Sequence, residues 1–220
     1  ITIYPRPKAD FYFDDQCVKR LVTFTDTSTV NFGSVVSRDW ELSGKKDTGK
    51  VVSSLYYTEG KRDIQLVVAS QFGCKDTLVK SLTVHPEPTA AFSANEVCLR
   101  DTTQFTDNVT LSNGSVVSYQ WVFDDGYTGS GKNITHVYRN WGDYSVELIA
   151  TSDKGCINNT KKTVRVNPLP RADIFTPTPY GCEPFEVSFT DNSKVPQTTI
   201  NKWLWQFGDK KTDTLQNPIH

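Results

Sequence analysis

The stretch Tyr119-Gln120-Trp121-Val122-Phe123-Asp124-Asp125-Gly126 alternates bulky and polar residues and then stops in two acids and a glycine. This alternation is typical of a half-buried β-strand, and Asp-Asp-Gly is typical of the turn that follows one. The pattern recurs as Trp203-Leu204-Trp205-Gln206-Phe207-Gly208-Asp209-Lys210, and a divergent copy reads Arg38-Asp39-Trp40-Glu41-Leu42-Ser43-Gly44-Lys45. Trp40, Trp121 and Trp205 stand 81 and 84 residues apart. The spacing predicts a chain of tandem repeats, each built around one Trp strand.

A Pro-x-Pro sequence opens each repeat, at Pro5-Arg6-Pro7, Pro86-Glu87-Pro88 and Pro168-Leu169-Pro170. Proline fixes φ and favours extended structure in the residue before it, so these segments are expected to be short, stiff hinges. We therefore expect three domains, residues 1–85, 86–167 and 168–220, of which the third is incomplete. Because the sequence begins without a signal peptide and ends partway through a repeat, we expect an internal segment of a longer protein.

Turn residues divide each complete repeat into six or seven short β-patterned runs, and no segment shows a sustained helical period with caps. The predicted fold class is all-β, with tandem immunoglobulin-like sandwiches. The recurring tryptophan of each central strand is expected to fill the core.

Cysteines recur with the repeats. Cys17 and Cys74 are 57 residues apart, Cys98 and Cys156 are 58 apart, and Cys182 begins a third set. The matched spacing predicts the disulfides Cys17–Cys74 and Cys98–Cys156, with a partner for Cys182 beyond His220. Such bonds imply an oxidising, extracytoplasmic setting. The alternative is five buried, reduced thiols in a cytosolic protein.

The composition excludes two classes of function. The net charge is −1 with no basic stripe, so nucleic-acid binding has no electrostatic basis. No apolar run approaches the roughly 20 residues that a membrane helix needs, so we expect no membrane insertion in this segment.

The second and third repeats resemble the PKD domain, a family common in surface and secreted proteins. Its Trp-Asp-Phe-Gly-Asp-Gly strand and turn matches Tyr119 to Gly126 and Trp205 to Asp209, and its His-x-Tyr and Gly-x-Tyr-Val-x-Leu segments match His136 to Tyr138 and Gly142 to Leu148. The first repeat departs from it: Ser43-Gly44 replaces the acidic turn, Leu55 stands where His136 is expected, and Tyr57 is taken as the counterpart of Tyr138.

The cysteines and Pro-x-Pro junctions are similar to those of long Bacteroidota surface proteins, including gliding-motility adhesins and other type IX secretion cargo. This resemblance implies a non-catalytic extracellular stalk of a cell-surface adhesin. Its partners would be the neighbouring repeats of the same chain and, beyond them, surface polysaccharide or the secretion and motility machinery. The alternative is a set of accessory carbohydrate- or protein-binding modules of a secreted hydrolase.

Few residues suggest chemistry of their own. The three histidines are not clustered with unlike ligands as a catalytic triad or zinc site requires, so we expect no enzyme within these residues. Asp124-Asp125 and Asp209 are interpreted as turn residues, with a calcium site as the alternative and no other cofactor expected. The aspartates of the recurring Phe-Thr-Asp triplets are expected to cap turns. These are Asp26, Asp107 and Asp191.

Two surface features complete the predictions. Short Asp-Thr motifs resemble the O-glycosylation signal of Bacteroidota, which implies modification at Thr77, Thr102 or Thr214. Trp141, in a turn beside Gly142, is the exposed aromatic residue most suited to stack on a sugar or contact a partner.

Overall fold

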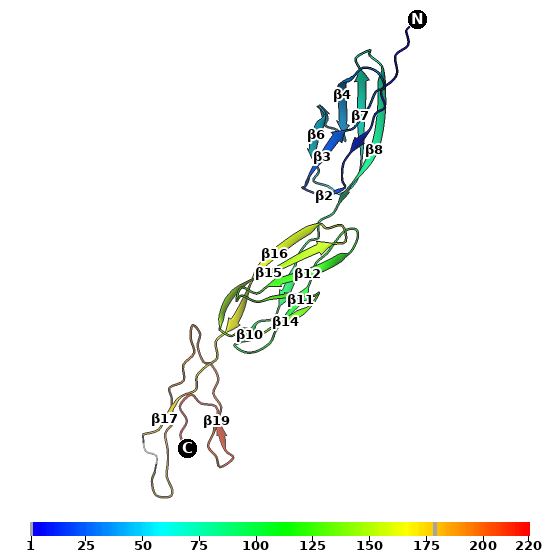
Figure 1. The fold of residues 1–220 in the computed structure, drawn as a ribbon. Coiled ribbons are helices and arrows are strands. Elements are labelled where there is room, and N and C mark those ends of the chain that lie inside the picture. Colours follow the sequence, from blue (N-terminus) through cyan, green and yellow to red (C-terminus); the bar gives the residue numbers. More distant parts are fainter. Residues whose placement is uncertain (1, 178–179) are drawn as a thin grey trace.

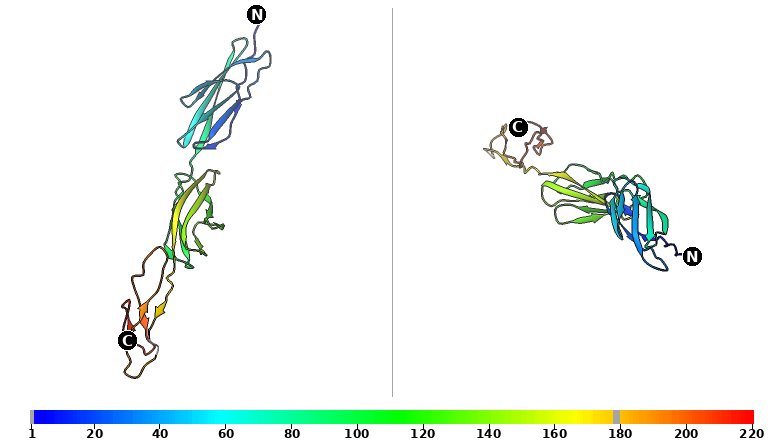
Figure 2. Two further views of the ribbon diagram at one scale, coloured as in Figure 1. Left: turned by 90° about the vertical axis from the view of Figure 1, so that its left-hand side faces the viewer. Right: turned by 90° about the horizontal axis from the view of Figure 1, so that it is seen from above.

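The computed structural model describes residues 2–177 and 180–220. Its regular elements in these ranges are all β-strands, and they form three groups that follow one another end to end (Figure 1). The view turned by 90° about the vertical axis shows the same extended arrangement (left panel of Figure 2). The three groups correspond to the three sequence repeats, called here the first, second and third repeat.

The first repeat has two facing sheets, in the orders β1-β3-β6 and β2-β8-β7-β4-β5. Most neighbours are antiparallel, and the short β2 runs parallel to the end of β8. Its strands are β1 (Phe11–Tyr12), β2 (Gln16–Cys17), β3 (Leu21–Asp26), β4 (Val35–Leu42), β5 (Lys46–Thr48), β6 (Val51–Leu55), β7 (Gly60–Ser70) and β8 (Lys75–His85).

The second repeat has the same sheets, β9-β11-β14 and β10-β16-β15-β12-β13, in the same topology. Its strands are β9 (Phe92–Ala94), β10 (Val97–Cys98), β11 (Thr103–Asp107), β12 (Val116–Val122), β13 (Thr128–Ser130), β14 (Ile134–His136), β15 (Gly142–Ser152) and β16 (Ile157–Asn167).

Alternating apolar side chains close the core between the two sheets. In the long strand β15, Val146, Leu148 and Ala150 are buried while their neighbours face outward, because successive side chains of a strand point to opposite faces. Strand β7 repeats this pattern with Ile64, Leu66 and Val68. Each repeat therefore has its own core of aliphatic and aromatic side chains, as a sandwich requires.

The third repeat contains short strands β17 (Ile174–Phe175), β18 (Thr190–Asp191), β19 (Trp205–Gln206) and β20 (Thr212–Asp213). Strand β17 pairs with β18, and β19 pairs with β20. A bridge between Ser188 and Ile219 corresponds to the β11–β14 pairing of the second repeat. Residues 168–220 thus reproduce the first half of the repeat, without counterparts of β15 and β16.

The prediction of an all-β chain of immunoglobulin-like sandwiches is confirmed. In the part of the chain that the structure describes, no helix has the length and apolar character needed to cross a membrane.

Candidate functional site

The recurring tryptophans lie inside the sandwiches. Trp40 is 2% exposed and Trp121 is fully buried, and each packs edge-on against the phenylalanine of the first strand, Phe11 or Phe92. The indole N–H of Trp121 donates to the carbonyl oxygen of Gly131 at 2.9 Å, and that of Trp40 donates to Gly49 at 3.0 Å. A buried indole needs such an acceptor, so the tryptophan ties the central strand to the following hairpin.

Trp205 makes the equivalent bond, to the carbonyl oxygen of Leu215 at 2.8 Å, but it is only half-buried. In the described part of the third repeat, residues 168–177 and 180–220, no strand pairs with β19 as β15 pairs with the Trp strand β12. It packs against Phe189 alone among the aromatic rings of its repeat.

The acids of the second repeat close the turn after the Trp strand. Asp125 accepts a hydrogen bond from His136 Nε2 at 2.7 Å, and the ring of His136 stacks on Phe123 with centroids 4.2 Å apart. Asp124, whose φ is 63°, accepts from the backbone N–H of Ser145 at 2.9 Å. We name Asp125, His136 and Phe123 the turn clamp. The carboxylates of Asp124 and Asp125 are thus both engaged by groups of the protein itself.

The third repeat has the same clamp. His220 stacks on Phe207 with centroids 4.1 Å apart and donates to Asp209 at 3.1 Å. The backbone N–H of Lys211, helped by His220, holds the pKa of Asp209 below its usual value. Within residues 2–177 and 180–220 no three His, Cys, Asp or Glu side chains are placed to hold a metal ion.

The Phe-Thr-Asp aspartates cap turns in all three repeats. Asp26, Asp107 and Asp191 each accept from the backbone N–H two residues later, at 2.9, 2.9 and 3.0 Å. Each also faces the side chain two positions before the tryptophan. Arg38 donates to Asp26 at 2.6 Å, and Trp203 donates to Asp191 at 2.9 Å. The bonds from Ser193, with those from Trp203, lower the pKa of Asp191 to about 2.

The structure contradicts both disulfides predicted within repeats. Cys17 is bonded to Cys156 of the second repeat, with Cα atoms 5.6 Å apart and a sequence separation of 139. Cys74, Cys98 and Cys182 are free thiols. The expectation that Cys182 has a partner beyond His220 stays a prediction.

Strand length explains the error. Cys17 pairs with His85 at the end of β8, whereas Cys74 immediately precedes the start of β8. Because a strand rises about 3.3 Å per residue, the two cysteines lie roughly 36 Å apart, and a disulfide needs Cα atoms within about 7 Å. Cys98, beside Asn167, and Cys156 are separated by β16 in the same way.

The first junction is held by several contacts besides the disulfide. Lys19 forms an ion pair with Glu87 of the linker at 3.1 Å, and Asn158 of the second repeat donates to the carbonyl oxygen of Pro88 at 2.8 Å. Glu59 of the first repeat accepts from Ser112 of the second at 2.8 Å. The Pro-x-Pro segment is thus anchored on both sides, and the junctions are the candidate functional site.

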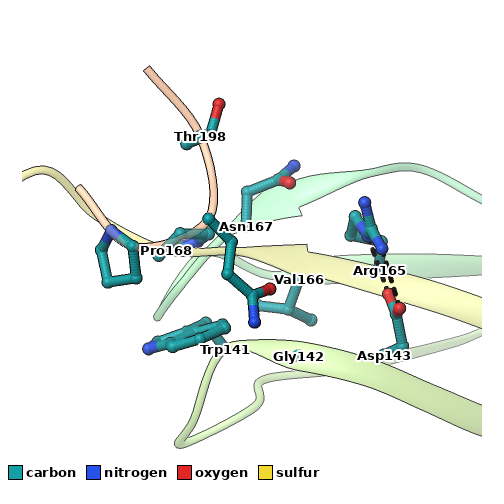
Figure 3. Close-up of a pocket in the computed structure, with 10 residues that line it drawn as sticks. Trp141, Gly142, Asp143, Arg165, Val166, Asn167, Pro168 and Thr198 are labelled. Carbon is teal, nitrogen blue, oxygen red and sulfur yellow. Dashed lines mark hydrogen bonds and ion pairs between the residues drawn. The ribbon is translucent and has the colours of Figure 1, made fainter. Parts of the chain in front are cut away.

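The second junction contains a cavity of about 160 Å³ between the end of the second repeat and a loop of the third. Figure 3 shows Trp141 below the strand end at Val166, Asn167 and Pro168, with Thr198 of the third repeat opposite. Trp141 is 37% exposed and lines this cavity between the repeats, so its ring is only partly available to stack on a sugar. At the rim, Arg165 forms a two-bond ion pair with Asp143 at 2.8 Å and lowers its pKa.

The three threonines of the Asp-Thr motifs are exposed, so each is accessible to modification. Thr77 lies on β8, and Thr214 follows β20. Their glycosylation stays a prediction.

Sequence reasoning assigned one core position wrongly. Tyr57 is 72% exposed, whereas Tyr56 is 8% exposed and takes the place of the buried Tyr138. The turn after the Trp strand is one residue shorter in the first repeat: Leu42 N–H donates to Lys45, whereas Phe123 N–H donates to Tyr127. Ser54, not Leu55, is therefore the counterpart of His136, as the strand pairings show. The sequence shows the shorter turn in the spacing from the tryptophan to the glycine that accepts its indole hydrogen bond, because Gly49 is one residue closer to Trp40 than Gly131 is to Trp121.

Comparison with known proteins identifies the family of the second repeat. Residues 83–168 match the family model described as PKD domain. The chain is 42% identical over 65 residues to collagenase ColA of Bacillus cereus, which is 29% of this chain and 7% of that protein. It is 36% identical over 98 residues to the pre-pro-metalloprotease PrtV of Vibrio cholerae, which is 43% of this chain and 10% of that protein. The chain thus spans a tenth or less of the length of these relatives.

Among solved structures, the PKD1 domain of Vibrio anguillarum Epp is 31% identical, with a TM-score of 0.35, and the match covers 36% of this chain and 93% of that one. The family match covers the whole second repeat and coincides with the segment that has both complete sheets, the buried tryptophan and the turn clamp. The second repeat is therefore a PKD domain.

Proposed function

We propose that this chain is a non-catalytic spacer of an extracellular protein, in which consecutive PKD-type domains hold an attached domain at a fixed distance and direction. The observation that carries this proposal is the first junction. Two repeats joined end to end are linked there by the Cys17–Cys156 disulfide, and the linker is anchored by the Glu87 and Pro88 contacts. In a flexible tether the two domains would rotate freely, whereas this junction fixes them at several points.

An extracellular location follows from the disulfide and from the relatives. Disulfides form and persist in oxidising compartments. PKD domains occur in secreted proteins such as the collagenase and metalloprotease that this chain resembles. The domain boundaries at residues 85 and 167, and the assignment of the first and third repeats to the same family, form part of the proposal.

For the attached domain we favour a secreted hydrolase, with these repeats as accessory modules. The curated matches are to a collagenase and a metalloprotease, and each is confined to a small part of a much longer enzyme. In this arrangement the repeats position the catalytic domain relative to an insoluble protein or polysaccharide substrate.

A cell-surface adhesin stalk, including one of the gliding-motility or type IX secretion kind, is the second candidate. The extended arrangement of the repeats favours it, because force applied along the long axis passes through the covalent bond between Cys17 and Cys156 (Figure 1).

The two candidates are separated with the full-length protein and a variant in which residues 1–220 are replaced by a Gly/Ser linker of equal length. An accessory spacer predicts that both proteins hydrolyse a small soluble substrate at the same rate. Only the native one should act efficiently on insoluble substrate. Retained activity on both substrates would contradict the spacer role. Absence of any hydrolysis, with loss of cell attachment in the variant, would favour the stalk.

A further inference from the structure

The bond between Cys17 and Cys156 joins two recurring positions, one present in all three repeats and the other in the first two. Cys17 lies beside the end of the last strand, in register with His85, and the next residue, Val18, donates its N–H to the carbonyl oxygen of His85 at 2.9 Å. We call this position the strand-end cysteine. Cys156 lies in the turn between the two long strands, and we call this position the hairpin cysteine.

Cys98 is a strand-end cysteine of the second repeat. It is in register with Asn167, and Leu99 donates its N–H to the carbonyl oxygen of Asn167 at 2.8 Å. Unlike Cys17, it is an exposed free thiol. It lies at the end of the second repeat that adjoins the third, beside Asn167.

Cys74 is a hairpin cysteine of the first repeat. Its turn repeats the turn of Cys156: Ser70 N–H donates to Cys74 and Gly73 N–H donates to Ser70, both at 2.9 Å, as Ser152 and Gly155 do in the second repeat. The Sγ atom of Cys74 lies 3.9 Å from the carbonyl oxygen of Tyr4. Tyr4 precedes the first Pro-x-Pro as His85 precedes the second, so Cys74 faces the place of a strand end in the same way that Cys156 does.

At the second junction, the second and third repeats meet through the same loops that join the first and second repeats at the first junction. Glu59, directly before β7, contacts Ser112 across the first junction. Trp141, directly before β15, lines the cavity at the second junction with Pro196, which stands at the repeat position of Ser112 (Figure 3). The third repeat therefore approaches Cys98 as the second repeat approaches Cys17.

We propose that Cys17–Cys156 is one rung of a ladder of disulfides, in which the strand-end cysteine of each repeat bonds the hairpin cysteine of the repeat that follows. Cys98 then bonds a cysteine of the third repeat, 84 residues after Cys156 by the spacing of Trp121 and Trp205. By the same rule Cys182 bonds the repeat after that, and Cys74 bonds the strand-end cysteine of a repeat before residue 1.

Each rung forms by oxidation of two thiols. Both cysteines lose their S–H protons, one S–S bond forms, and two electrons pass to a dithiol–disulfide exchange partner, whose own disulfide is reduced to two thiols. This partner is a disulfide-carrying oxidant of the extracytoplasmic compartment.

The test is disulfide mapping of the full-length protein. The unreduced protein is alkylated with iodoacetamide, digested and examined by mass spectrometry without reduction. The expected product is the Cys98 peptide linked to the peptide that carries the hairpin cysteine of the third repeat. The ladder is overturned by an alkylated Cys98, by a bond between Cys98 and Cys156, or by a third repeat that has no cysteine in that turn.

Two variants of the full-length protein sharpen the mapping. Cys98→Ser should release one alkylated thiol, at the hairpin of the third repeat, and leave Cys17–Cys156 intact. Cys182→Ser is the matched control and should leave the Cys98 rung unchanged. Loss of the Cys17–Cys156 bond in Cys98→Ser would contradict the assignment of separate rungs.

Discussion

The first and second repeats have the same strand order and the same pairing of the Trp strand, yet they close the following turn by different contacts. The second repeat uses the turn clamp of Asp125, His136 and Phe123. The first has a turn one residue shorter, closed by Glu41, which accepts from the backbone N–H of Gly44 at 2.7 Å. Both place a tyrosine, Tyr56 or Tyr138, in the core. The tryptophan, the capping aspartate and the alternating strands thus specify the fold, and the clamp is an addition to it.

The largest expected effect tests whether the tryptophan has the same role in both repeats. Trp40→Ala and Trp121→Ala should each destabilise their own repeat by about 3–5 kcal/mol, because each removes a large buried ring and its hydrogen bond. Denaturant unfolding, followed by hydrogen exchange in each repeat, should show loss of protection in the mutated repeat only. Trp141→Ala, which alters a partly exposed tryptophan at the second junction and outside the core of the second repeat, is the control, with an expected change in stability of about 1 kcal/mol or less.

The capping aspartate should matter more in the first repeat. Asp26 is 2% exposed and pairs with Arg38, whereas Asp107 is less buried and lies near Tyr119. Asp26→Ala leaves a partly buried guanidinium without its carboxylate, and the expected cost is about 2–3 kcal/mol. Asp107→Ala removes mainly a turn bond, at about 1 kcal/mol.

The free energy of unfolding of each variant, measured in urea at neutral pH, tests this difference. Asp39→Ala, which alters an exposed acid on the same strand as Arg38, is the control. Equal costs for Asp26→Ala and Asp107→Ala would contradict the distinction.

The fold was predictable from the sequence because its signals are local. The alternation from Tyr119 to Phe123 and its copies fix strands and their buried faces. The pairing of the cysteines was not predictable from their spacing. In a tandem repeat, any two recurring positions have matched separations, whether the bond lies within a repeat or between repeats. The length of β8 decides between them, since it keeps Cys17 and Cys74 at opposite ends.

The turn clamp was only partly predictable. Asp-Asp-Gly and Phe-Gly-Asp indicate a turn, and the histidine recurs, but their contact depends on the hairpin length that brings His136 opposite Asp125. The junction contacts depend on how two repeats meet, which no local pattern encodes.

Removal of the turn clamp should leave the second repeat folded, with a turn that lacks the histidine as in the first repeat, and should lower its unfolding free energy moderately. His136→Ser introduces the residue found at the equivalent Ser54 and loses both the stack on Phe123 and the bond to Asp125. The expected cost is about 1–2 kcal/mol in the unfolding free energy of the second repeat.

A double-mutant cycle with Asp125→Ala measures the bond itself, and we expect the two substitutions to be non-additive by at least about 0.5 kcal/mol. Additive costs would show that the clamp is not a coupled unit.

The smallest expected effect is a gain in stability. Thr103 is fully buried and its hydroxyl has no hydrogen-bond partner among the residues that the structure describes, whereas the first repeat has the buried Val22 at the equivalent position of β3. A buried hydroxyl without a partner costs free energy, and valine has nearly the same shape without the polar atom. Thr103→Val should therefore stabilise the second repeat by about 1 kcal/mol in denaturant unfolding. The reverse substitution, Val22→Thr, should destabilise the first repeat by a similar amount. A loss of stability in Thr103→Val would mean that its hydroxyl has a partner in solution, and that the two repeats differ in their cores as well as in their turns.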